Sequence, residues 1–252
     1  MERLWGYLAI VKRIFSARLL PFRLFLSLSA LTLLGGCAGA DVAVQSTRLP
    51  VPVVEPLPIS VGIHLSDEVR TFAHEEAIRD YGTFKITVGP TQDLMFNNLA
   101  EGLFANHRFL ADTASRPNDV NAILVPTIGE LQFSIPAQTK SDFFEVWLSY
   151  DFELLSPDGT QIAQWPMKAY GRANARNYGF LEDTENGALQ EAARVALRDA
   201  MAVFTFKFKR VPGVQQWLQQ FTGPGQQNSP QSEADLTLPQ TQDAALNDSG
   251  EQ

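Results

Sequence analysis

The chain of 252 residues carries 28 acidic and 20 basic side chains, which gives a formal net charge of −8 at pH 7. Phosphate groups would repel a protein of this charge, so the balance excludes a nucleic-acid-binding function. The sequence contains one cysteine, which excludes a disulfide within the chain.

The first 36 residues have the composition of an export signal. Cations come first, an apolar stretch over residues 24–34 follows, and small residues end the segment. The cations are Arg3, Lys12, Arg13, Arg18 and Arg23. The apolar stretch is shorter than the roughly 20 residues that a membrane-spanning helix needs, which makes a signal anchor the weaker alternative. Removal of residues 1–36 takes away five basic and one acidic side chain and leaves a net charge of about −12.

The only cysteine follows this signal directly. The stretch "LGGC" at residues 34–37 resembles the lipobox of bacterial lipoproteins. The resemblance implies that the Cys37 thiol receives a diacylglycerol, that cleavage occurs between Gly36 and Cys37, and that the new amino group is acylated. Two or more acyl chains hold a protein stably on a membrane. Ala38 and Gly39 follow instead of the aspartate that retains lipoproteins in the inner membrane, so the resemblance implies the outer membrane. The alternative is an incidental buried cysteine.

Two segments differ in composition from the rest of the mature chain. Residues 37–58 are small and polar at first and then proline-rich ("RLPVPVVEPLP"), which predicts an extended spacer of about 3.1 Å per residue. Residues 222–252 contain five acidic side chains and no lysine, arginine or aromatic residue, which predicts a disordered tail. A single globular domain is expected between them, over residues 59–221.

The first half of this domain predicts two strands and a helix. Apolar and polar residues alternate over residues 57–65 and again over 84–88, as in half-buried strands. Pro90 suits the first position of a helix, and Asp93 suits its first turn. The apolar stripe of this helix consists of Phe96, Leu99, Ala100, Leu103 and Phe104.

The second half predicts a strand, a long hairpin and a terminal helix. Residues 121–135 form a strand candidate in which Pro126 indicates a bulge or an edge. Alternation over residues 144–154, the turn "SPDG" and residues 161–171 predict a hairpin. A helix begins near residue 183 or 184 and ends in cations, which are Lys207, Lys209 and Arg210. A short amphipathic helix follows Gly213.

These elements predict an α+β fold. It is a two-layer sandwich in which a mixed or antiparallel sheet of about five strands has two main helices on one face. The stretches "LMFNNLAEGLF", "VNAILVPTIGELQFSI", "SPDGTQIAQW" and "GALQEAARVALRDAM", in this order, resemble the YajG-type small envelope lipoproteins. They are more loosely similar to the lipopolysaccharide-assembly lipoprotein and to the amino-terminal domain of TolB. The chain departs from the YajG type in its amino-terminal extension, in residues 65–82 and in its acidic tail. The resemblance supplies no catalytic residues.

Metal binding and catalysis find little support in the sequence. The three histidines are His64, His74 and His107, and "HEEAI" from residue 74 lacks the second histidine of a zinc-protease helix. A solvated charged face is favoured over a metal site formed by His74, Glu75, Glu76 and Asp80. No metal, cofactor or catalytic residue is therefore expected.

One pair of carboxylates is a candidate for a catalytic site. Asp151 and Glu153 share one face of a strand, where carboxylates are usually exposed, and an acid and base pair would need environments that separate the two pKa values. A hydrolase built on such carboxylates is thus the least favoured function.

Exposed aromatic residues indicate a partner surface. If the apolar face of residues 144–154 meets the helices, Phe143 and Trp147 point to the opposite side among polar residues, as interface anchors do. The alternative is that they pair across the hairpin with Trp165 or Met167. We therefore expect a non-catalytic, lipid-anchored protein of the Gram-negative envelope that binds an envelope protein. The alternative is a module that encloses a lipid or another apolar ligand between its sheet and helices.

Overall fold

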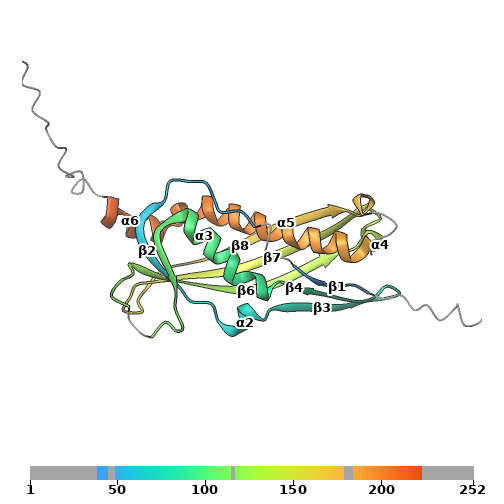
Figure 1. Ribbon diagram of the computed structural model, residues 1–252, viewed down its shortest axis with the longest axis horizontal. Helices are drawn as coiled ribbons and strands as arrows, with labels where there is room; N and C mark the ends of the chain where they lie inside the picture. Colours follow the sequence, from blue (N-terminus) through green and yellow to red (C-terminus); the bar gives the residue numbers. More distant parts are fainter. Residues whose placement is uncertain (1–38, 45–48, 115–116, 179–183, 223–252) are drawn as a thin grey trace, which may run out of the picture.

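A computed structural model describes residues 39–44, 49–114, 117–178 and 184–222 (Figure 1). The predicted signal peptide, the cleavage and lipidation residues Gly36 and Cys37, and residues 223–252 of the predicted tail lie outside the described residues. The statements below concern the described part of the chain.

The main sheet has five strands in the order β5-β2-β6-β7-β8. Strand β2 (Leu57–Ile63) runs parallel to both β5 (Phe104–Phe109) and β6 (Ala122–Ser134). Strands β7 (Phe143–Leu155) and β8 (Gln161–Asn174) continue the sheet in antiparallel pairing. The sheet is therefore mixed, and the predicted α+β class with about five strands is confirmed.

A second sheet of three strands was not predicted. Strand β4 (Gly82–Thr87) lies between β1 (Asp41–Ala43), which is parallel to it, and β3 (Ala73–Ile78), which is antiparallel. Phe84 of β4 contacts Phe133 of β6 with 5.6 Å between ring centroids. The small sheet thus packs against the main sheet near the carboxyl end of β6.

Part of the predicted spacer over residues 37–58 packs against the domain, while Val51, Val53 and Val54 remain exposed. Ala40, Val42 and Val44 are buried, and the main-chain oxygen of Val44 accepts a hydrogen bond of 2.7 Å from the Thr91 hydroxyl. Farther along, the side chain of Asn98 donates to the oxygen of Leu49. These contacts hold the segment against the domain. Burial of its alternating apolar side chains is more favourable in free energy than their exposure to water in an extended chain.

Two long helices cover one face of the main sheet (Figure 1). Phe96 of α3 and Phe204 of α5 both contact Phe152 of β7, with ring centroids 6.3 and 4.8 Å apart. The helices are α2 (Asp67–Arg70), α3 (Gln92–Leu103), α4 (Pro136–Thr139), α5 (Thr184–Lys207) and α6 (Pro212–Thr222), with the 3-10 turns η3 (Gly89–Thr91), η4 (Ala175–Asn177) and η5 (Phe208–Arg210).

The structure corrects one local prediction and decides between the two alternatives of another. Phe104 does not extend the stripe of α3, because its backbone is already extended (φ −123°, ψ 146°) and begins β5. Pro126 lies beyond Leu124, the last residue of β6 that is paired with β2. On that side β6 has no neighbouring strand at Pro126, so the proline is in an edge-like position. The irregularity of β6 occurs later, between Ile128 and Leu131.

Aromatic rings fill the space between β7, β8 and α5. Trp165 stacks on Phe152 at 5.4 Å, and Phe204 stacks on Phe208 at 5.4 Å. Burial of each such side chain contributes about 1.5–3 kcal/mol before the entropy cost of ordering. Gly171 of β8 lets α5 approach, since a Cβ there would lie 2.1 Å from the main-chain oxygen of Ala192.

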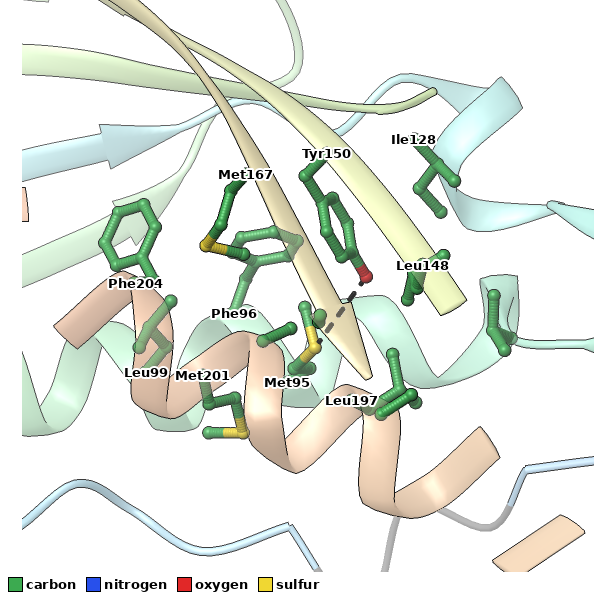
Figure 2. Packing of buried hydrophobic residues seen from close by; sticks show 14 of the residues in the cluster. Met95, Phe96, Leu99, Ile128, Leu148, Tyr150, Met167, Leu197, Met201 and Phe204 are labelled. Carbon is green, nitrogen blue, oxygen red and sulfur yellow. Dashed lines mark hydrogen bonds between the residues drawn. The ribbon is translucent and has the colours of Figure 1, made fainter. Parts of the chain in front are cut away.

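One polar pair lies inside this core. The hydroxyl of Tyr150 donates to Gln92 Oε1 at 2.9 Å. The same hydroxyl lies 4.0 Å from Met95 Sδ, and Figure 2 marks this contact with a dashed line. The Gln92 amide in turn donates to the oxygen of Val88 at 3.1 Å. Burial raises the pKa of Tyr150 well above its usual value, so the phenol stays protonated and links β7 to the start of α3.

Replacement of Tyr150 by phenylalanine tests this link. The change leaves the buried Gln92 Oε1 without its donor, so the free energy of unfolding should fall by about 1–3 kcal/mol in urea denaturation. Tyr81→Phe, at an exposed ring, is the control and should change stability by less than about 0.5 kcal/mol. Equal effects of the two substitutions would contradict the role of the buried pair.

Candidate functional site

The face of the main sheet opposite the helices carries a group of aromatic and charged side chains from β7 and β8. We call this group the open-face cluster. It consists of Phe143, Glu145, Trp147, Tyr170 and Arg172. Trp147 is 40% exposed and Tyr170 is 36% exposed, although both rings are large and largely apolar. The structure therefore places Trp147 on the side that the strand alternation predicted.

The two exposed rings form a cross-strand pair. Trp147 is the register partner of Tyr170, and their ring centroids are 5.4 Å apart at an interplanar angle of 41°. The predicted alternative partners, Trp165 and Met167, are buried on the helix side of β8. That alternative is wrong, because successive residues of a strand point to opposite faces, and Trp165 and Met167 are on the face opposite to Tyr170.

Hydrogen bonds and a cation fix the rest of the cluster. The Tyr170 hydroxyl donates to one oxygen of Glu145, and the Ser134 hydroxyl donates to the other at 3.2 Å. Arg172 lies over the ring of Phe143, with 4.8 Å between the guanidinium carbon and the ring centroid. The pKa of Tyr170 is raised above its ordinary value. Partial burial is the larger cause, and the negative charge of the Glu145 carboxylate is the next. The rings are thus held in place at the surface.

A small hollow of about 100 Å³ lies beside Trp147. Its walls include Glu130, Gln132, Ser149 and Lys168. The Ser149 hydroxyl bonds to both main-chain groups of Glu130, accepting from the nitrogen at 2.8 Å and donating to the oxygen at 3.3 Å. These bonds hold the irregular part of β6 open next to the aromatic pair. The hollow suits one small side chain of a partner.

The predicted histidines do not converge. His64 Nδ1 lies 3.3 Å from the oxygen of Leu110, and His107 Nε2 lies 3.1 Å from Asn97 Oδ1. His74 is on β3, where its Nε2 lies 3.5 Å from a carboxylate oxygen of Glu76. In the described part of the chain, no group of three or more acidic, histidine or cysteine side chains has an arrangement that would hold a metal ion.

The carboxylates considered for catalysis lie on the outer side of β7. Asp151 is exposed and Glu153 is half-buried, at register positions opposite Pro166 and Gln164. These direct partners have no titratable side chain, since proline and glutamine carry neither an acid nor a base.

The place expected for an enclosed ligand is occupied by side chains. Phe152, Trp165, Phe204 and Phe208 pack on one another between the sheet and α5. An apolar groove of about 480 Å³ lies outside this core, between α5 and residues 50–54. This groove is open to solvent. Because aromatic side chains fill the space between β7, β8 and α5, the packing argues against a ligand enclosed there.

Within the ranges that the structure describes, no helix is long and apolar enough to cross a membrane.

Comparison with known proteins gives weak likenesses only. No protein-family model and no curated protein matches the chain. Among solved structures, the PelC dodecamer from Paraburkholderia phytofirmans is 15% identical, with 61% of this chain and 91% of that chain covered and a TM-score of 0.34. A lipoprotein from Neisseria meningitidis is 12% identical, covers 49% and 88%, and has a TM-score of 0.28. A hypothetical protein from Chlamydia trachomatis is 10% identical, covers 59% and 96%, and has a TM-score of 0.32. Likenesses of this size do not establish a family for this chain.

The pKa of Tyr170 tests the geometry of the open-face cluster. Glu145→Gln keeps a hydrogen-bond acceptor but removes the negative charge that disfavours the phenolate, so the pKa of Tyr170 should fall toward its ordinary value of 10.0. A pH titration of ring-labelled tyrosines by NMR measures it. Asp151→Asn, on the same strand, is the control and should leave the Tyr170 titration unchanged. An unchanged titration in Glu145→Gln would show that the two groups are apart in solution.

Proposed function

We propose that this chain is a non-catalytic lipoprotein of the Gram-negative outer membrane whose domain binds an envelope protein through the open-face cluster. The observation that carries the binding role is the exposed Trp147–Tyr170 pair, held on the side of the sheet that the helices leave uncovered. Tryptophan, tyrosine and arginine are the residues that contribute most to binding at protein interfaces.

The fixed geometry of the cluster supports this function. Glu145 orients the Tyr170 hydroxyl, and the cross-strand pairing orients Trp147. A partner would therefore meet side chains that lose little conformational freedom on binding, which raises affinity for a given contact area. The surrounding carboxylates and cations form the polar rim that such interfaces usually have.

The anchor is inferred from the sequence that precedes the domain. The stretch "LGGC" follows a basic and apolar signal, and Ala38 and Gly39 lack the charge that would retain the protein in the inner membrane. Thioether attachment at Cys37 and acylation of its amino group would supply the two or more chains that stable anchoring requires.

The first experiment concerns the anchor. The full chain, expressed in a Gram-negative host fed with an alkyne analogue of palmitate, should become labelled and should sediment with outer-membrane vesicles. Cys37→Ala should lose both properties, because the only thiol of the chain is gone. Mass spectrometry should find the mature chain beginning at acylated Cys37. A mature chain that retains residues 1–36, or a free thiol at Cys37, would refute the anchor.

The second experiment concerns the partner. Cross-linking in living cells followed by purification of the chain should recover an envelope protein, and Trp147→Ser should reduce its recovery about tenfold or more, because a central aromatic anchor contributes about 2 kcal/mol or more. Phe206→Ser is the matched control, since Phe206 is an aromatic residue 65% exposed on α5, and recovery should not change. Equal recovery with Trp147→Ser, at equal thermal stability, would exclude the open-face cluster as the interface.

A further inference from the structure

The amino-terminal end of the described chain is fixed beside one turn of the small sheet. The nitrogen of Lys85 donates to the oxygen of Ala40 at 2.7 Å, and Asp41 is in register with Lys85. A Cβ added to Gly39 would lie 1.7 Å from the oxygen of Thr83, so the two backbones touch. Gly39 therefore lies against Thr83, immediately after the β3–β4 turn.

The length of chain between this contact and the anchor is very short. Cys37 precedes Gly39 by two residues, which span at most about 7 Å when fully extended. Acyl chains attached to Cys37 would therefore enter the membrane within about 7 Å of Gly39. The spacer expected over residues 37–58 cannot hold the domain away from the bilayer, because the chain from Gly39 to Val44 already belongs to the fold.

The β3–β4 turn has side chains that suit a bilayer surface. Arg79, Asp80 and Tyr81 are exposed, and the Tyr81 ring is 41% accessible. The Tyr81 nitrogen donates to the oxygen of Ile78 at 3.0 Å, and Asp80 and Gly82 adopt positive φ angles of 67° and 88°, which close the turn. A tyrosine places its ring among lipid headgroups with its hydroxyl in water, and an arginine extends its charge to the phosphates.

We propose that the β3–β4 turn lies on the phospholipid surface that holds the anchor, with Tyr81 and Arg79 among the headgroups. The proposal rests on the proposed lipidation of Cys37. Figure 1 shows the β3–β4 turn and α6 toward opposite ends of the long axis. The domain then stands on the bilayer by its β3–β4 end, and α6 faces away from it.

The test uses the full, lipidated chain in vesicles of phosphatidylethanolamine and phosphatidylglycerol. Since the thiol of Cys37 is consumed by its lipid, a cysteine introduced elsewhere is the only free thiol. Tyr81→Cys and, as a second variant, Arg79→Cys are labelled with an environment-sensitive fluorophore. Gln220→Cys, at an exposed position on α6, is the matched control. Lipids that carry a headgroup quencher are then added to the vesicles.

The expected result is quenching at positions 81 and 79 that is at least several times stronger than at position 220. Equal quenching at all three positions would overturn the proposed docking. If the wild-type chain does not react with the thiol label in the same experiment, the lipidation of Cys37 is still supported. Labelling of the wild-type chain would instead show a free Cys37, which refutes the anchor itself. A melting temperature equal to that of the wild type confirms that each variant is folded.

Discussion

The contact between α5 and the inner side of β7 and β8 determines the rest of this structure. Phe152, Trp165 and Phe204 interlock there, and the small Gly171 allows the helix backbone to lie directly on the strand. Because the burial of these rings removes apolar surface from water, the hairpin has a defined inner face. The same contact defines the outer face, where Trp147 and Tyr170 remain at the surface. The core thus decides which aromatic residues are available to a partner.

Elements with strong local patterns could be predicted from the sequence, and elements that depend on distant partners could not. The alternation of β7, the apolar stripe of α3 and the start of α5 all follow from residues close in sequence. Strand β1 has only three residues and is stabilised by pairing with β4, more than 40 positions later. Strand β3, in "AHEEAI", is a charged edge strand, so it lacks the apolar alternation that would identify it. In β5 the chain changes from helix to strand at Phe104, and the nearest glycine, Gly102, still belongs to the helix and so does not mark the boundary.

The candidate site shows the same division. The exposed side of Trp147 follows from strand alternation alone, but its neighbour Tyr170 depends on the register of the hairpin. The irregularity between Leu154 and Leu155 displaces the pairing by one residue, and this displacement brings Tyr170 rather than Ala169 opposite Trp147. The bond from Tyr170 to Glu145 depends on that register too, because the two residues are diagonal neighbours. A pattern read from one strand at a time lacks this information.

The outer edges of the main sheet are both protected. On β8 the nitrogen of Tyr170 donates to the Asp199 carboxylate of α5 at 2.9 Å, so a side chain occupies a position where another strand would bond. On β5 the exposed edge carries Arg108, whose guanidinium group pairs with Asp119 at 2.7 Å. Charges and blocked donors at sheet edges hinder pairing between molecules. Copies crowded together on a surface would therefore resist aggregation by strand addition and remain separate, folded units.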